Sequence, residues 1–186
     1  MTDPSPQFDP AAALMERCAR EDGEEAFSEL VGKFSAPVLN FFVRAGVGIN
    51  DASDLTQEVF IRLWKRRKGY TPGAKFSTYL FTIARSVRID DLRRKDSRRR
   101  TEKTWLENRD VLEAKPERPP HAEAVRRAVA ALPEKLRDAV ELGFFQNLPY
   151  AEVSQILSIP VGTVKSRVFN AVAKLKEMLE KEGIRL

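Results

Sequence analysis

Apolar residues recur at spacings of three and four along most of the chain, which is the periodicity of one face of an α-helix. The first four segments with this spacing run over residues 10–20, 23–45, 51–68 and 76 to about 99, with glycines and a proline between them. The strict alternation that marks a half-buried strand is almost absent. This pattern predicts a first helical domain over residues 1–103.

The periodicity then stops and resumes further along the chain. Residues 104–124 contain Pro116, Pro119 and Pro120 and show no helical spacing, which predicts a flexible linker. From residue 125 to residue 186 a second set of helical segments follows. The sequence therefore predicts an all-α fold of two small helical domains joined by a flexible linker.

The second domain has the spacing of a helix-turn-helix. The short helix AEVSQIL is followed by the turn SIP, and Pro160 suits the start of the next helix because its missing N–H would be unpaired there. In that long helix we expect one apolar stripe to face the core, at Val164, Val168, Val172, Leu175 and Leu179. The polar side chains point elsewhere, and those that we expect to contact DNA are Thr163, Lys165, Ser166, Arg167 and Asn170. A merely solvated face is the alternative.

Charge is concentrated in one place. The chain carries a formal net charge of +5, and residues 85–103 alone hold nine Lys and Arg against four acidic residues. Such a block commonly pairs with nucleic-acid phosphates, because each neutralised phosphate releases condensed counterions. A solvated helix end is again the simpler alternative.

Composition restricts the classes of function. No apolar run approaches the length of a membrane span, and the start MTDPSPQFDP lacks the features of a signal peptide, so we expect a cytoplasmic protein without membrane insertion. One cysteine, Cys18, and one histidine, His121, cannot form a disulfide or a zinc site. There is no glycine-rich phosphate loop and no nucleophile beside a plausible base, so we expect neither enzymatic activity, nor a metal, nor a cofactor.

Three stretches, in order, carry a resemblance to a known family. They are DLTQEVFIRLW (54–64), FSTYLFTIARSVRIDDLRRKDSRR (76–99) and LPEKLRDAVELGFFQNLPYAEVSQILSIPVGTVKSRV (132–168). They resemble regions 2.2, 2.3 to 2.4, and 4 of the extracytoplasmic-function sigma factors of bacterial RNA polymerase. The resemblance implies a protein that binds core polymerase, recognises the minus-35 promoter element with its second domain, and reads and melts the minus-10 element with its first. It also implies an anti-sigma factor as a partner.

The segment 51–68 is expected to contact polymerase. Leu55, Val59 and Leu63 mark its buried side, and a displaced edge combines large apolar side chains with a glutamine. The resemblance assigns this edge to the clamp helices of the largest polymerase subunit, through Asp54, Gln57, Glu58, Phe60, Ile61 and Trp64. The alternative is that Phe60 and Trp64 only widen the core.

The segment 76–99 is expected to contact the minus-10 element. A protein that separates base pairs without ATP must hold the exposed bases and the strand, and aromatic rings and arginines do this. The residues expected to do so are Phe76, Tyr79, Arg85, Ser86, Arg88, Arg93 and Arg94. Tyr79 stands where the family often has Trp, Ser86 where it commonly has Asn, and Asn170 where it often has Arg, which leaves the preferred promoter sequence open.

Two other classes of protein account for part of the sequence. A helix-turn-helix regulator that acts without replacing a sigma factor would explain residues 132–180, but it would not need the aromatic and basic stretch at 76–100. A helical anti-sigma or scaffold protein would not need the polybasic block. The sigma-factor interpretation accounts for both.

Overall fold

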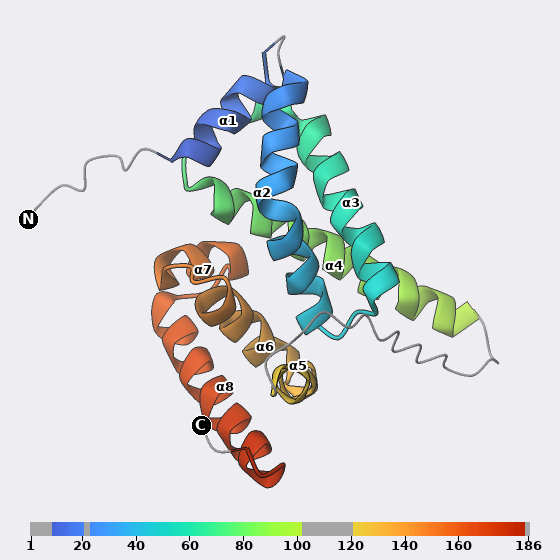
Figure 1. Cartoon of the computed structure of the whole chain (residues 1–186), viewed down its shortest axis with the longest axis vertical. Helices are drawn as coiled ribbons and strands as arrows, with labels where there is room; N and C mark the ends of the chain where they lie inside the picture. Colours follow the sequence, from blue (N-terminus) through green and yellow to red (C-terminus); the bar gives the residue numbers. More distant parts are fainter. Residues whose placement is uncertain (1–8, 21–22, 102–120, 185–186) are drawn as a thin grey trace, which may run out of the picture.

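The computed structural model of the protein describes residues 9–20, 23–101 and 121–184, and for residues 98–101 it describes the backbone alone. Every regular element in these ranges is helical, which confirms the predicted all-α class (Figure 1). Residues 104–120 of the predicted linker lie outside the described ranges. None of the described helices is both long enough and apolar enough to cross a membrane.

The helices form two groups along the chain. The first helical group consists of α1 (Pro10–Cys18), α2 (Gly23–Arg44), α3 (Ile49–Arg66), a short 3₁₀ turn (Arg67–Gly69) and α4 (Phe76–Thr101). The second helical group consists of α5 (Ala122–Ala131), α6 (Glu134–Val140), a π-helical segment (Glu141–Phe145), α7 (Tyr150–Leu157) and α8 (Val161–Lys181). These bounds follow the apolar periodicity of the sequence closely, because each helix needs a face to bury.

The first group has an aromatic core. α2 and α3 run side by side and α4 crosses behind them (Figure 1). Phe41, Phe42 and Phe81 lie buried at the crossing, with the Phe41 and Phe81 rings 5.8 Å apart. The carboxylate of Asp9 accepts a hydrogen bond from the Ala11 amide and another from the Phe76 amide, at 3.0 and 2.7 Å. One side chain thereby satisfies free backbone donors at the starts of both α1 and α4.

The helix-turn-helix is formed by α7 and α8. Ser158 ends α7 in the left-handed conformation, with φ of 54°, and the Ile159 amide bonds back to the Ser154 carbonyl at 3.1 Å. α8 begins directly after Pro160, as the sequence predicted. The expected apolar stripe of α8 is correct except at Val172, whose side chain is 45% exposed. At about 100° per residue, Val172 lies off the stripe's centre and the buried Ala171 takes its place.

The two groups pack against each other. α7 lies against α4, and α5 approaches α2 (Figure 1). One continuous set of buried apolar side chains joins the groups, including Phe81 and Val87 from α4 and Leu142, Val153 and Ile156 from the second group. A separate, smaller core lies within the second group, around Val129 and Leu175. The sequence predicted the helices but did not predict this contact.

Candidate functional site

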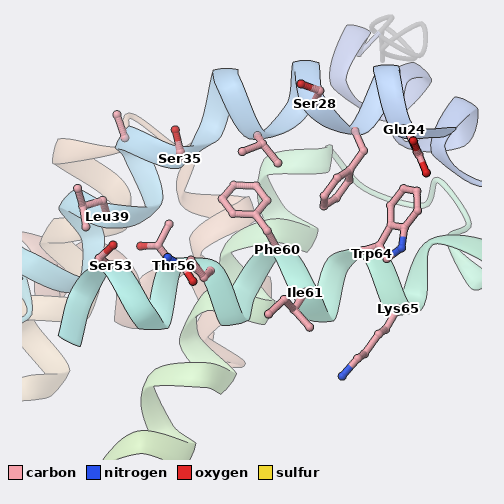
Figure 2. Close-up of a pocket in the computed structure, with 14 residues that line it drawn as sticks. Glu24, Ser28, Ser35, Leu39, Ser53, Thr56, Phe60, Ile61, Trp64 and Lys65 are labelled. Carbon is pink, nitrogen blue, oxygen red and sulfur yellow. The ribbon is translucent and has the colours of Figure 1, made fainter. Parts of the chain in front are cut away.

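An apolar groove lies between α2 and α3. It has a volume of about 810 Å³, and every residue that lines it belongs to the first helical group. Figure 2 shows the α3 side chains Phe60 and Trp64 directed toward α2, whereas Ile61 and Lys65 lie on the side of α3 that faces away from α2 in this view. The side chains that line the groove are Glu24, Phe27, Ser28, Val31, Ser35, Ala36, Leu39, Ser53, Thr56, Gln57, Phe60, Ile61, Trp64 and Lys65.

Aromatic side chains pack together at one end of the groove. The ring of Phe27 lies 4.8 Å from that of Trp64 and 6.3 Å from that of Phe60. The guanidinium of Arg67 lies over the Trp64 ring at 3.7 Å and donates a hydrogen bond to the Trp64 carbonyl. Such contacts add to the energy of burial and fix ring orientation. The groove therefore presents a preformed apolar wall.

The residues predicted to bind polymerase differ in exposure, and their exposure follows their position on α3. Ile61, Gln57 and Asp54 are exposed along α3, with Ile61 45% exposed. Phe60 is buried at 7% exposure and Trp64 is half-buried, so both complete the core and also line the groove. Leu55, Val59 and Leu63 are buried, which confirms the expected inner side.

Glu58 belongs to an ion-pair bridge from α3 to α4. Arg62 donates to Glu58 and to Asp90, at 2.7 Å in each case. The hydrogen bonds that Arg62 donates to Asp90 and Glu58 raise the pKa of its guanidinium. The Arg62–Asp90 pair joins α3 to α4, and Glu58 holds Arg62 from within α3, so Glu58 has a structural contact in addition to any contact with a partner.

The start of α4 is mostly buried. Phe76 has no exposed surface and packs 5.1 Å from the ring of Phe34, while Tyr79 is half-buried against Tyr70 at 5.2 Å. Burial raises the pKa of Tyr70 to about 12. In this arrangement Phe76 faces protein, because its ring completes the core of the first group. Further along, Ser86 is half-buried and Arg93 and Arg94 are exposed.

Arg88, a predicted DNA contact, is buried between the two groups. Its side chain is 7% exposed, it donates a hydrogen bond to Asp138 of α6, and it lies 3.9 Å from Glu134. Arg85, one turn earlier, is 33% exposed and lies 4.0 Å from the same Asp138 carboxylate. Because a buried guanidinium without a partner is costly, the Arg88–Asp138 pair helps to fix how the groups dock.

Glu152 of α7 makes a second polar contact with α4. Its carboxylate accepts hydrogen bonds from Thr78 at 2.9 Å and Ser77 at 3.3 Å, and it lies 3.1 Å from the ammonium of Lys75. Asp138 and Glu152 together contact Lys75, Ser77, Thr78, Arg85 and Arg88. This is the part of α4 that the sequence assigned to the minus-10 element.

Glu141 makes a third polar contact between the groups, with α2. Arg44 donates to its Oε1 atom at 2.8 Å, and Gln146 donates to the same atom at 3.0 Å. The side chain is 3% exposed and its Oε2 atom has no hydrogen-bond partner. Burial raises the pKa of Glu141, although Arg44 and Gln146 act in the opposite direction.

The outer face of α8 is open to solvent. Lys165, Ser166 and Asn170 are exposed and Thr163 and Arg167 are half-buried, so the face that the sequence assigned to DNA is uncovered. The Ser166 hydroxyl donates to the Thr163 carbonyl at 3.0 Å. Phe169 lies on this face with 75% of its surface exposed. The sequence analysis gave Phe169 no role, although an aromatic outside the apolar stripe was the available signal.

Cys18 is a core residue. It has no exposed surface, and burial raises the pKa of its thiol. Among the described residues, no group of three His, Cys, Asp or Glu side chains is placed to hold a metal ion.

The sequence analysis missed the acidic side of the contact between the groups. Asp138, Glu141 and Glu152 are buried at 8%, 2% and 8% exposure, and none was singled out. Their signal in the sequence was weak: each carboxylate stands next to alanine or valine within a short apolar run. The α2 side of the groove, with Phe27 and Val31, was also missed as a surface, since both read as core positions.

Comparison with known proteins agrees with this arrangement. Residues 31–98 match the family described as Sigma-70 region 2, and residues 122–175 match Sigma-70, region 4. Two solved structures share the fold at 20% identity. CnrH, solved with the cytosolic domain of CnrY, has a TM-score of 0.70 and covers 93% of this chain and 99% of its own. RpoE of Bartonella quintana, solved with the anti-sigma factor NepR, has a TM-score of 0.75 and covers 84% and 98%.

Sequence relatives cover nearly the whole chain. The ECF RNA polymerase sigma factor RpoE of Cereibacter sphaeroides is 32% identical over 183 residues, which are 95% of this chain and 98% of the relative. The RNA polymerase sigma-H factor of Pseudomonas aeruginosa is 30% identical over 179 residues, 90% and 92% of the two chains. The chain therefore belongs to the extracytoplasmic-function sigma factors of bacterial RNA polymerase.

Proposed function

This sigma factor directs transcription initiation, and we propose that it does so through three separate surfaces. They are the α2–α3 groove, the exposed side of α4 and the outer face of α8. The groove binds core polymerase, α4 captures the minus-10 element, and α8 reads the minus-35 element. The observation that carries this proposal is the groove, because its apolar wall is preformed and open while the chain is folded. An exposed apolar surface of this kind is typical of a protein interface.

The groove suits a helix with apolar side chains on one face. Ile61 contributes exposed apolar surface at its rim, and Gln57 and Asp54 supply polar contacts beside it. These features support the assignment to the clamp helices of the largest polymerase subunit. The ring contacts around Trp64 support it further, since side chains that are already packed in place lose little conformational entropy on binding.

The DNA contacts are proposed for a reduced set on α4. Arg93 and Arg94 are exposed and suit phosphates, and Tyr79 and Arg85 retain partly exposed surface. Ser86 is half-buried in the same stretch and stays in the set, and Arg88 stays in it only for a chain in which the second group no longer covers it. We leave Phe76 out of the set because its ring is buried in the core. On α8 the proposed contacts are Thr163, Lys165, Ser166, Arg167 and Asn170.

The proposed partners are core polymerase, promoter DNA and an anti-sigma factor, and the proposed location is the cytoplasm. The anti-sigma proposal draws on the solved structure of RpoE, which has the same fold as this chain and was solved in complex with the anti-sigma factor NepR. Binding of these partners, rather than catalysis, is the activity proposed for the chain. The division into a first domain of residues 1–103, a linker of residues 104–124 and a second domain of residues 125–186 is part of the proposal.

Chemical probing of melted promoter DNA tests whether α4 and the groove have these separate functions. Holoenzyme assembled with the full chain should make thymines in the minus-10 region reactive to permanganate. Tyr79→Ala should reduce that reactivity while leaving co-elution with core polymerase intact, because α4 and the groove are separate surfaces. If Tyr79→Ala abolished co-elution and left the reactivity of residual complexes unchanged, the assignment of α4 would be wrong. Tyr150→Ala, which removes an exposed tyrosine ring outside α4, is the control.

A further inference from the structure

A second cavity lies where the two helical groups meet, and it has a volume of about 300 Å³. The turn at residues 45–48 and part of α4 form its walls on the side of the first group, and Glu134 and Arg137 of α6 form the opposite wall. Because both groups contribute to the lining, the cavity exists only while they are docked. Its wall differs from that of the apolar groove, since it contains the cationic side chains of Arg88, Lys95 and Arg137.

Arg137 reaches this cavity without an ion pair to any of the described residues. Its Nη1 atom donates to the Ala45 carbonyl at 2.7 Å, across the contact between the groups, and its Nε atom is buried and has no hydrogen-bond partner among those residues. The carboxylates of Glu134 and Asp138 pair with Arg88 instead. Burial lowers the pKa of Arg137, and the charge of Arg88 lowers it further, although the two carboxylates act in the opposite direction. A buried donor without a partner costs free energy, so an acceptor at this Nε atom is favourable.

The other cations at the cavity are already paired. Lys95 pairs with two aspartates, at 2.9 and 3.0 Å, and Arg88 donates to Asp138, which does not itself line the cavity. The carboxylates in the lining are those of Asp91 and Glu134. Against the three cationic side chains they leave an excess of one positive charge in the lining. This excess attracts a negatively charged ligand, and the unpaired guanidinium is the group left to bind it.

A small oxyanion fits these features. A water molecule in the cavity would satisfy the Nε donor of Arg137 but would leave its charge without a partner. A phosphate group supplies both, because its oxygens accept charge-assisted hydrogen bonds from the planar donor fork of arginine. The volume of about 300 Å³ is several times the roughly 30 Å³ that one water occupies in the liquid, which leaves room for a phosphate group.

We propose that this cavity binds a phosphate group against Arg137, and that the bound anion stabilises the docked arrangement of the two helical groups. Because the walls come from both groups, the separated groups hold no complete site. A ligand that binds one of two states shifts the equilibrium toward that state, by a factor of about eleven when its concentration is ten times its dissociation constant. The phosphate group belongs either to a free inorganic anion or to a nucleotide, and the test separates these sources. The inference does not depend on the functions proposed for the groove, α4 and α8.

Calorimetric titration of the full chain, at an ionic strength held constant with chloride, measures binding of inorganic phosphate, pyrophosphate and a nucleoside diphosphate in separate arms. Arg137→Gln removes the charge that the anion would contact. Arg127→Gln is the matched control, because Arg127 is an exposed arginine of the same group that pairs with Glu182 outside the cavity. Leu92→Glu is a second test variant, since it places a carboxylate in the lining and leaves the bond from Arg137 to Ala45 in place. Circular dichroism shows whether each variant is folded.

We expect wild type and Arg127→Gln to bind the anion saturably at one site, and Arg137→Gln to bind it about tenfold more weakly, as for the loss of a hydrogen bond to a charged group. Leu92→Glu should also bind more weakly, because like charges repel. Hydrogen exchange with and without the anion should be slowed on both walls of the cavity, at residues 45–48 and along α6, in wild type and in the control. A nucleoside diphosphate that binds more tightly than pyrophosphate identifies a nucleotide as the source, and equal or weaker binding identifies the free anion.

Three results overturn the proposal: no saturable binding of any of the three probes to wild type, equal affinities of Arg137→Gln and Arg127→Gln, or slowed exchange on one wall alone. If Arg137→Gln does not fold, Leu92→Glu decides the location, because an unchanged affinity in that variant places the anion elsewhere on the chain. The experiment contains neither polymerase nor DNA, so a failure here leaves the proposed function unaffected.

Discussion

Arg44 at the end of α2 and Glu141 in the π-helical segment are 97 residues apart in the chain, and their Nη1 and Oε1 atoms lie 2.8 Å apart in the structure. The contact is buried on the glutamate side and joins the two helical groups. The guanidinium of Arg44 also lies 4.6 Å from the ring of Phe145. Glu141 is therefore an ionisable group whose environment depends on the docking of the two groups.

The first prediction concerns pH. Burial raises the pKa of Glu141 above its ordinary value of 4.5, so the folded chain binds a proton there more readily than the unfolded chain does. The contribution of this group to stability is then fully present below pH 4.5 and is lost as pH rises through the raised pKa. Glu141→Gln removes this pH dependence. As pH rises from 4.5 toward neutrality, the free energy of unfolding of the variant should increase relative to that of wild type.

Denaturant unfolding at a series of pH values checks this. Glu182→Gln is the control, because Glu182 is an exposed residue that pairs with Arg127 within the second group. A difference between Glu141→Gln and wild type that is constant with pH would contradict the assignment of the shift to Glu141.

The helices and their buried faces could be predicted from the sequence because local spacing determines them. Leu55, Val59 and Leu63 were placed correctly by periodicity alone. Val172 was misplaced because periodicity gives only an approximate angle, and a neighbouring alanine fills the stripe equally well. The contact between the groups could not be predicted, since pairs such as Arg88 with Asp138 are 50 residues apart and no local rule connects them.

For the candidate site, helical spacing together with the family resemblance singled out the α3 edge and the polar face of α8, which the structure leaves largely exposed, and geometry changed the interpretation of particular residues. Glu58 is held by Arg62, and Phe76 is enclosed by the core of the first group. The α2 wall of the groove was not recognisable, because Phe27 and Val31 follow the same helical spacing as any core residue. A groove is a property of two helices together and has no signature in either one alone.

The second prediction concerns the groove. Ile61→Asp should weaken binding to core polymerase about tenfold or more, because it places a charge on exposed apolar surface that the partner would cover. Stability should change little, since the side chain is already 45% exposed. Competition for core polymerase against a labelled sigma factor measures the affinity. Leu92→Asp, at a position of similar exposure outside the groove, is the control, and equal losses in both variants would contradict the assignment.

The third prediction concerns the basic end of α4. Replacing Arg93 and Arg94 by Gln should weaken binding of holoenzyme to many promoters alike, because phosphate contacts carry little sequence information. The slope of log affinity against log salt should fall by about 0.9 for each phosphate of duplex DNA that the variant no longer neutralises. Binding to core polymerase should be unaffected. An unchanged salt slope would mean that neither side chain contacts a DNA phosphate.

The fourth prediction concerns Asn170 on the exposed face of α8. Arginine pairs best with guanine, whereas asparagine can pair bidentately with adenine, so we expect Asn170 to favour adenine at one minus-35 position. A good base contact of this kind discriminates by about 1–3 kcal/mol. Asn170→Ala should therefore relax selectivity at that base pair in a randomised minus-35 library. Lys176→Ala, further along the same helix, should leave selectivity unchanged, and an equal loss at all positions for Asn170→Ala would indicate a backbone contact instead.

The central claim is that the chain gives core RNA polymerase promoter specificity, and run-off transcription in a purified system measures this directly. Core polymerase, the full chain and a pool of genomic promoter fragments are combined, and the transcripts are sequenced at their 5′ ends. We predict discrete start sites that require the full chain and share one pair of minus-35 and minus-10 elements, and that disappear with Ile61→Asp. Transcripts that start at the same places without the chain, or that show no shared elements with it, would contradict the claim.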